Sequence, residues 1–225
     1  MSVKNSDRRV PEQNSSFPND RLCIVDVRIN ERLRGELKGG YQVILSDGFF
    51  FFINAKIHKE ENISPGGFLT HAGAKDLEFR SDLITAERKA RFLVSRAEHS
   101  SKQIRDKLFK KGFSKRVIEN VLDRFIENRL IDDRRFAEQW IFSRLRKHPE
   151  GSIVLRYGLL KRGISKKIAD EVLSELITEE IAAKSIEKAG EKILRRSTDK
   201  NRLKRLLYGR GFKISEINRY IKKHY

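Results

Sequence analysis

The chain has 225 residues, with 49 lysines and arginines against 31 aspartates and glutamates, and its formal net charge is +18. This charge predicts an anionic partner, with nucleic acid or an acidic protein surface favoured over a membrane. A single cysteine, Cys23, excludes an intramolecular disulfide and is interpreted as a small core residue. The longest apolar run, Phe49–Ile53, is far shorter than the roughly 18 residues of a membrane span, and no signal peptide is recognisable, so a cytoplasmic protein is expected.

The charge excess is confined to the C-terminal part of the chain. Residues 1–84 hold 12 basic and 12 acidic residues, so all of the excess lies in residues 85–225. Residues 1–20 are rich in Asn, Ser, Pro and charge without any periodicity, which predicts a disordered tail.

Residues 21–84 are predicted to form a small β-rich region. Leu22–Ile29, Tyr41–Leu45 and Phe49–Ile53 are typical of strands, and Asp47-Gly48 favours a hairpin turn between the last two. Four consecutive phenylalanines, residues 49–52, break the alternation of a half-buried strand, so both faces of this strand are expected to be covered. A base-stacking role is a weaker alternative, because no cations are interleaved. Residues 56–80 predict an irregular connection or a short helix.

Three near-copies of one segment mark an internal repeat in the rest of the chain. They are Leu108–Ile118, Leu159–Ala169 and Leu207–Ile217, and their glycines lie 51 and then 48 residues apart. Apolar residues follow helical spacing, with expected core positions eight and four residues before each glycine and six and ten residues after it. These positions are Ile104, Leu108, Ile118 and Leu122, then Leu155, Leu159, Ala169 and Leu173, then Leu203, Leu207, Ile217 and Ile221.

The predicted fold class is therefore mainly α, with three tandem three-helix repeats of helix-turn-helix type in an elongated array behind the β-rich region. The repeats are assigned to residues 85–131, 132–178 and 179–225. In the first repeat, helices are expected from Thr85, over Lys102–Lys111 and over Lys115–Asn128. Because three short helices bury little apolar surface alone, neighbouring repeats are expected to pack on one another.

The repeated glycines, Gly112, Gly163 and Gly211, are expected to end helices in the left-handed conformation, which glycine adopts without a steric cost. Ser114 and Ser165 follow two positions after the first two glycines, where a hydroxyl can cap the next helix. Lys213 replaces this serine in the third repeat, so the last helix is expected to begin later or to fray.

The repeats also repeat their cations, which are the candidate partner-binding residues. One cation precedes each glycine, and another lies seven residues before it, about two helical turns away on nearly the same face. Stacked repeats would align these cations into a basic stripe able to follow a phosphate backbone or an acidic protein groove. For any single position a structural alternative stays open, in which the cation complements a helix dipole or is solvated. The candidates are Arg105, Lys110, Lys111, Arg156, Lys161, Arg162, Lys204 and Arg210.

The segment Leu130–Ala137 joins the first repeat to the second and carries the adjacent carboxylates Asp132 and Asp133. One could cap the following helix and the other could pair with Arg134 or Arg135, a structural role favoured over metal binding. There is no phosphate-binding glycine loop, Cys/His cluster or nucleophile elbow, and the five histidines are scattered. We therefore expect no catalytic residues, no cofactor and no metal, and we find no compact set of side chains suited to reading base edges.

The string Leu130-Ile-Asp-Asp-Arg-Arg-Phe-Ala137 resembles the signature of the RecX family of recombination regulators. His99–Leu108 with Lys111-Gly112, and Gly151 ahead of Leu155 with Arg162–Ile164, are similar to the same family. The resemblance covers residues 85–225 and implies three tandem three-helix repeats, with Asp132, Asp133 and Phe136 as structural linker residues. The β-rich region is similar to an N-terminal extension found in some members.

The resemblance implies a non-enzymatic regulator, expected to be a monomer, that binds the RecA recombinase and its filament on single-stranded DNA. Members of the family typically inhibit the ATPase, strand-exchange and coprotease activities of that filament, and so modulate recombination, DNA repair and the SOS response. The cations would then contact acidic groups on RecA, the DNA, or both. The alternative is a general nucleic-acid-binding protein with helix-turn-helix-like modules, which charge alone does not separate from the first hypothesis.

Overall fold

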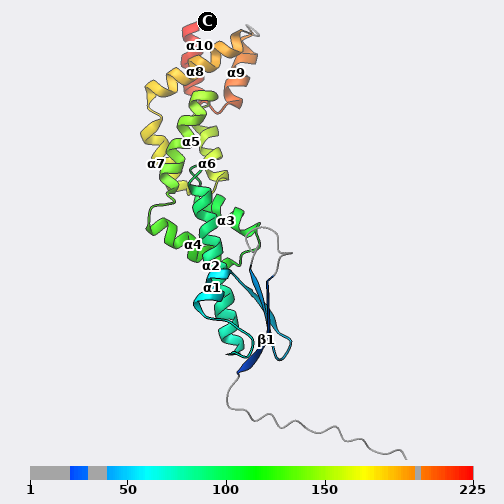
Figure 1. Cartoon of the computed structure of the whole chain (residues 1–225). Coiled ribbons are helices and arrows are strands. Elements are labelled where there is room, and N and C mark those ends of the chain that lie inside the picture. The colour runs from blue at the N-terminus through cyan, green and yellow to red at the C-terminus, as the bar shows by residue number, and fades with distance from the viewer. Residues whose placement is uncertain (1–20, 30–39, 196–198, 225) are drawn as a thin grey trace, which may run out of the picture. The chain divides into compact units, whose positions relative to one another are not determined.

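The computed structural model describes residues 21–29, 40–195 and 199–224, so the predicted tail at residues 1–20 lies outside the described part (Figure 1). The chain divides into two compact units, Met1–Ser81 and Asp82–Tyr225. The described strands all belong to the first unit and the repeated helices to the second. This is the mainly α fold with a small β-rich beginning that the sequence predicts.

A four-stranded antiparallel sheet in the order β3-β2-β1-β4 forms the first unit. The predicted strands are confirmed as β1 (Leu22–Ile29), β2 (Tyr41–Leu45) and β3 (Phe50–Ile53). In the hairpin turn between β2 and β3, Gly48 has a φ of 86° and the Asp47 carboxylate accepts a hydrogen bond from the Phe49 amide at 2.9 Å. The sequence did not predict β4 (Phe68–Leu69), which is only two residues long.

The phenylalanine run is not covered on both faces, so this prediction is wrong. Phe51 is 1 % exposed, whereas its neighbour Phe50 is 53 % exposed. Within the first unit, α1 (Ala55–Glu60) and the first part of α2 (His71–Val94) lie on one side of the sheet (Figure 1). Because successive side chains of a strand point to opposite faces, one layer of helices buries only every second phenylalanine.

Helix α2 begins well before Thr85, where the first repeat was expected to start. Ala74, Leu77 and Ser81 are buried along its first part, at the spacing of one helical face. These residues belong to the first unit. Because Ser81 is polar although it is buried, the helical periodicity of this segment cannot be recognised from apolar residues alone. The N-terminal half of α2 therefore completes the β-rich unit, and its C-terminal half opens the first repeat.

The second unit holds three repeats of three helices each. The first repeat combines the C-terminal half of α2 with two further helices, and each later repeat has three helices of its own. Their bounds are α3 (Ser101–Phe109), α4 (Lys115–Glu127), α5 (Asp133–Lys147), α6 (Ser152–Lys161), α7 (Lys166–Leu176), α8 (Glu179–Leu194), α9 (Lys200–Gly209) and α10 (Ile214–His224).

All twelve predicted core positions of the repeats are buried, and none is more than 7 % exposed. In the second repeat they form one cluster with Phe136 and Ile141 of α5, and in the third they form another with Ile186 and Ile193 of α8. The second and third repeats therefore each have an apolar core of their own.

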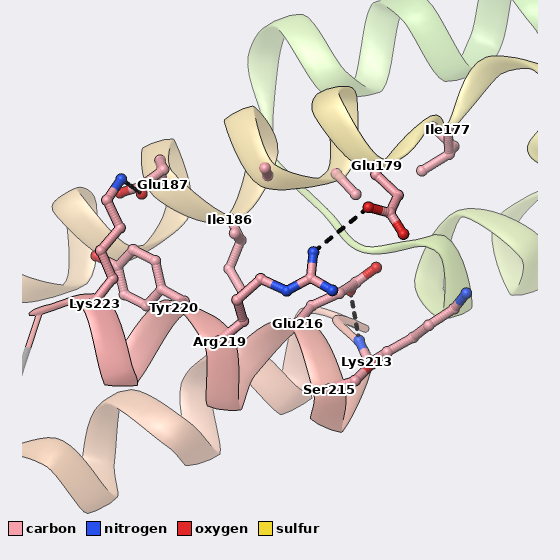
Figure 2. A pocket seen from close by; sticks show the side chains of 12 residues that line it. Ile177, Glu179, Ile186, Glu187, Lys213, Ser215, Glu216, Arg219, Tyr220 and Lys223 are labelled. Carbon is pink, nitrogen blue, oxygen red and sulfur yellow. Dashed lines mark hydrogen bonds and ion pairs between the residues drawn. The ribbon is translucent and has the colours of Figure 1, made fainter.

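The turns of the repeats follow the prediction, with one exception. Gly112, Gly163 and Gly211 have φ values of 89°, 85° and 81°, and serine hydroxyls cap α4 and α7. The expectation that the last helix starts late is wrong, because α10 begins three residues after its glycine, as α4 and α7 do. Glu216 provides the reason: its Oε2 accepts a hydrogen bond from the Lys213 amide at 2.8 Å, so a carboxylate within the helix stabilises its first turn (Figure 2).

Candidate functional site

The eight predicted partner-binding cations all lie on one kind of helix. They occupy the middle helix of each repeat, α3, α6 or α9, or the glycine turn that ends it. Arg105, Lys110 and Lys111 belong to α3, Arg156, Lys161 and Arg162 to α6, and Lys204 and Arg210 to α9. We call these three helices, together with their glycine turns, the helix series. The contacts between these three helices determine where the cations lie.

The turn that ends α9 contacts the start of α6. The Gly151 amide donates to the Arg210 carbonyl at 2.9 Å, and the Ile153 amide donates to the Gly211 carbonyl at 3.2 Å. Gly151 is the N-cap residue of α6 and provides no capping side chain. Because the first amides of a helix have no acceptor within it, they need one from elsewhere. The third repeat supplies these acceptors and so caps a helix of the second repeat.

This contact leaves no room for a side chain at either glycine. A Cβ added to Gly151 would overlap with the Gly211 carbonyl, and one added to Gly211 would overlap with the backbone of Val154 in α6. The close fit between the repeats therefore requires glycine at both positions, in addition to the backbone reason for Gly211.

The turn that ends α6 contacts the start of α3 in the corresponding way. Ser100 caps α3 by accepting from the Gln103 amide at 3.2 Å, and its own hydroxyl donates to the Arg162 carbonyl at 2.7 Å. A Cβ on Gly163 would overlap with the Lys102 side chain. The three helices therefore follow one another head to tail, α9 then α6 then α3, with the C-terminal turn of one against the N-terminus of the next (Figure 1).

The linker carboxylates strengthen the junction between the first and second repeats. Asp132 caps α5, accepting from the amides of Arg134 and Arg135 at 2.9 and 3.0 Å. Asp133 does not pair with a neighbouring arginine as expected: its carboxylate accepts from the amide and the hydroxyl of Ser101, both at 2.8 Å. One carboxylate therefore starts the second repeat, and the other holds that start against the first turn of α3.

Other residues of the linker segment are structural as well. Arg135 donates to Glu98 at 2.8 Å and to the carbonyls of Arg129 and Leu130. Phe136 is 6 % exposed within the core of the second repeat. Arg134 bridges α5 to α7 through Glu171 and Glu175. The segment on which the sequence resemblance is strongest therefore builds the connection between two repeats.

Two of the predicted contact cations, Arg105 and Arg156, are held by carboxylates of the following helix. Arg105 donates twice to Glu119, both times at 2.9 Å, and Arg156 donates twice to Asp170, at 2.5 and 3.2 Å. These hydrogen bonds raise the pKa of both guanidinium groups and lower the pKa of both carboxyl groups. The two pairs join α3 to α4 and α6 to α7.

Arg162 also contributes to packing. Its guanidinium carbon lies 4.5 Å from the centre of the Trp140 ring, and its Nη1 donates to the Gly158 carbonyl at 2.9 Å. Burial, together with the nearby charge of Arg144, lowers the pKa of this guanidinium. Arg210 is half-buried at the junction with α6, which it contacts through its carbonyl.

The remaining predicted cations are the lysines. Lys110, Lys111, Lys161 and Lys204 are exposed, and none of their ammonium groups forms an ion pair with a described residue. In the third repeat, Asn218 stands where α4 and α7 have the partner carboxylate, so Lys204 has no counterpart of the arginine pairs. Among the eight predicted cations, these four lysines are therefore the ones whose charges no described carboxylate holds.

The sequence analysis missed the aromatic side chains of the helix series. Phe109, Tyr157 and Tyr208 are 70 %, 69 % and 62 % exposed, which makes them the most exposed aromatic residues in the described part of the second unit. None of them stands at the core positions of its helix. An aromatic residue outside the apolar stripe, in the same helix of every repeat, was the signal that could have revealed them.

A groove of about 290 Å³ lies between α8 and α10 in the third repeat (Figure 2). Two of its three cations are partnered across the groove: Lys223 Nζ is 2.7 Å from Glu187, and Arg219 is 3.7 Å from Glu179. The third, Lys213, is exposed and its ammonium group forms no ion pair with a described residue, but it lies outside the helix series.

Among the described residues, no group of three or more His, Cys, Asp or Glu side chains could hold a metal ion. No described helix is both long enough and apolar enough to cross a membrane.

Comparison with known proteins identifies the first two repeats. The family model described as the first three-helix domain of RecX matches residues 86–125, and the model of the second three-helix domain matches residues 132–173. The chain is 34% identical over 122 residues to regulatory protein RecX of Chlorobium limicola, covering 53% of this chain and 77% of that protein. It is 28% identical over 199 residues to regulatory protein RecX of Clostridium acetobutylicum, covering 83% of this chain and 90% of that protein.

Solved structures agree with these relatives. The crystal structure of RecX from Lactobacillus salivarius matches with a TM-score of 0.58 and 25% identity, over 63% of this chain and 96% of that one. A second crystal structure of regulatory protein RecX, 20% identical, shares the fold with a TM-score of 0.63 over 88% of this chain and 97% of that one. The chain belongs to the RecX family of regulatory proteins.

Proposed function

We propose that this chain is a non-enzymatic regulator that binds the RecA recombinase and its filament on single-stranded DNA in the cytoplasm. It inhibits the ATPase, strand-exchange and coprotease activities of the filament, and thereby modulates recombination, DNA repair and the SOS response. The observation that carries the proposal is the helix series of a RecX-family chain, in which equivalent helices present free lysines one repeat after another.

The repetition of the helix series fits a polymeric partner. A filament offers the same acidic and phosphate groups again and again along its length, and linked contacts strengthen one another because each one raises the effective concentration of the next. Four lysines spread over three repeats can therefore bind together where a single lysine would be too weak. A small substrate would need a converging pocket instead.

The experiment measures the RecA ATPase on single-stranded DNA with substoichiometric amounts of this protein, at a salt concentration that abolishes its own DNA binding. Suppression under these conditions is expected, since it requires contact with the filament itself. Suppression only in proportion to the bare DNA that the protein coats would instead support the general nucleic-acid-binding alternative.

The variant that tests the helix series is the double reversal Lys110→Glu and Lys161→Glu. We expect inhibition to weaken by about tenfold or more, because each reversal replaces an attraction by a repulsion at the interface. Reversing Arg156 or Arg162 would be less informative, since both side chains also hold the fold together.

The matched control is Lys188→Glu with Lys222→Glu, which gives the same change in net charge on exposed lysines of α8 and α10. Lys161 and Lys222 both lie in the last turn of a helix, so the effects of reversal on the helix dipole are comparable. Equal loss of inhibition by both double variants would refute the helix series as the contact surface.

A further inference from the structure

We propose that the helix series binds single-stranded nucleic acid directly, with Phe109, Tyr157 and Tyr208 as platforms on which unpaired bases stack. The inference rests on the proposed function for its biological setting. It adds to that function by assigning direct contact with the strand to three named side chains. The argument depends on the exposure of the rings, on the cations beside them and on the order of the helices.

Each ring is available to a partner. Phe109, Tyr157 and Tyr208 are between 62 % and 70 % exposed, and none of them stacks on a cation or on another ring within the described residues. Phe92, on α2, shows the contrast: the Arg96 guanidinium lies 4.4 Å and the Lys89 ammonium 5.5 Å from the centre of its ring, so cations of its own chain already lie against it. The rings of the helix series have uncovered faces instead.

Each ring also has a predicted contact cation one helical turn away. Lys161 follows Tyr157 by four residues, and Lys204 precedes Tyr208 by four. Arg105 precedes Phe109 by four but is held by Glu119, so Lys110 and Lys111 at the end of α3 supply the unpaired charges of the first repeat. Residues four apart on a helix are neighbours on its surface. Aromatic rings interleaved with cations are the combination with which proteins bind single strands, because the rings stack on bases while the cations attract phosphates.

The head-to-tail order of the helices sets the order of the rings along the series. Because α9, α6 and α3 follow one another, a strand that runs along the series meets Tyr208, Tyr157 and Phe109 in turn. A helix of ten residues rises about 15 Å, so neighbouring rings serve different nucleotides of an extended strand. A duplex fits less well, because its bases are stacked on one another and do not offer their faces.

Exposed aromatic residues can also anchor a protein partner. The single strand is favoured here because the cation of each ring lies beside it in every repeat, whereas the centre of a protein interface is depleted of charged residues. The register of the rings differs between repeats, since Tyr157 stands one turn earlier than the other two. A flexible strand tolerates this difference more easily than a rigid protein groove would.

The experiment compares two labelled strands of about 30 nucleotides, longer than the ~4–16 nucleotides that one single-strand-binding module covers. One is oligothymidine and the other is an abasic strand with the same number of phosphates. Fluorescence anisotropy without any recombinase should show that the unmodified protein prefers oligothymidine. The triple variant Phe109→Ala, Tyr157→Ala, Tyr208→Ala should lose this preference and still bind the abasic strand as before.

The expected loss on oligothymidine is about fivefold or more for each ring removed. Phe142→Ala, which removes a 55 % exposed ring from α5, should change nothing, and Tyr157→Phe with Tyr208→Phe should keep the preference because the rings remain. Circular dichroism checks that the triple variant is folded. An unmodified protein without preference for bases, or a folded triple variant that keeps it, would overturn the inference.

The outcomes separate this inference from the proposed function. If the triple variant binds oligothymidine normally but no longer inhibits RecA, the rings contact protein, and the inference falls while the proposed function stands. If the unmodified protein binds bases through the rings but never inhibits RecA, the proposed function falls and the inference stands.

Discussion

At the scale of single residues, three glycines with the same backbone conformation have very different surroundings. Gly112, Gly163 and Gly211 all adopt a positive φ, but a Cβ on Gly112 would meet no described atom within 4 Å. At Gly163 it would overlap with the Lys102 side chain, and at Gly211 with the backbone of α6. The first glycine thus serves only its turn, and the other two also serve a junction between repeats.

Alanine substitutions should reveal this difference in the free energy of unfolding. Gly112→Ala is expected to cost about 1–2 kcal/mol, the penalty of the left-handed conformation. Gly211→Ala should cost about 1–3 kcal/mol more, because the methyl group collides with backbone that cannot move aside. Urea unfolding followed by circular dichroism measures both values.

Gly209→Ala is the control for these substitutions, because a Cβ there would also meet no described atom within 4 Å and the residue ends α9 with an ordinary φ. It should be neutral or slightly stabilising, as alanine is a better helix former than glycine. Equal losses for Gly112→Ala and Gly211→Ala would show that the junction with α6 is not closely packed.

At the scale of helices, the N-terminus of α6 is stabilised from outside its own repeat. Ser100 and Ser165 use hydroxyls to cap α3 and α7, whereas Gly151 leaves the first amides of α6 to the carbonyls of Arg210 and Gly211. A helix that looks uncapped in the sequence is therefore capped by the next repeat.

This arrangement reverses an ordinary rule of helix design. Serine is among the best N-cap residues, so Gly151→Ser should stabilise an isolated helix by a few tenths of a kcal/mol. In this protein it should destabilise by about 1–3 kcal/mol, because the new Cβ overlaps with the Gly211 carbonyl. The measurement is again urea unfolding, and a gain in stability would contradict the junction described here.

Helices, turns and core positions of the repeats were predictable from sequence because their causes are local. The 3.6-residue periodicity selects Ile104 and its equivalents for burial, and a glycine followed by a serine encodes the end of one helix and the start of the next. Lys213 is the exception, but its explanation is also local. The Glu216 carboxylate, three residues later, replaces the missing serine hydroxyl.

The contacts between repeats were not predictable from the sequence, because they join residues that are distant in it. Asp133 bonds to Ser101, and Ser100 bonds to the carbonyl of Arg162, 62 residues away, which no periodicity announces. The same distance effect divides the predicted cations: Arg105 and Arg156 have carboxylates 14 residues further along the chain, while the lysines have none among the described residues. These arginines and lysines look alike in the sequence. Only the fold distinguishes the cations that pair with a carboxylate from those that do not.

At the scale of the whole molecule, the repeats depend on one another through their junctions. The core of the second repeat is its own, but the first turn of α6 needs the third repeat and the first turn of α3 is held by residues of the second. Stability in such an array is the sum of repeat and interface contributions.

Removing residues 179–225 should therefore change the sign of one substitution. Without the third repeat, the amides of Gly151 and Ile153 lose their acceptors, and the space beside Gly151 opens. Gly151→Ser should then stabilise the shortened chain by a few tenths of a kcal/mol, since a hydroxyl can take the place of the lost carbonyls.

Thermal unfolding of four proteins, each chain length with and without Gly151→Ser, measures this interaction as a double-mutant cycle. The shortened chain must itself be folded, which near-UV circular dichroism of Trp140 reports. If the substitution has the same effect in both chain lengths, the cap of α6 does not come from the third repeat.

The head-to-tail order of α9, α6 and α3 has a consequence for how this protein meets its partner. Because the C-terminal turn of one helix contacts the N-terminus of the next, the series has two unlike ends: one begins with the N-terminus of α9, and the other finishes at the open turn of Gly112. Nucleic-acid strands have polarity too, with a 5′ and a 3′ end. Two polar objects bound side by side can be parallel or antiparallel, and the two alignments differ in energy, so a strand bound along the series as proposed would have one preferred orientation.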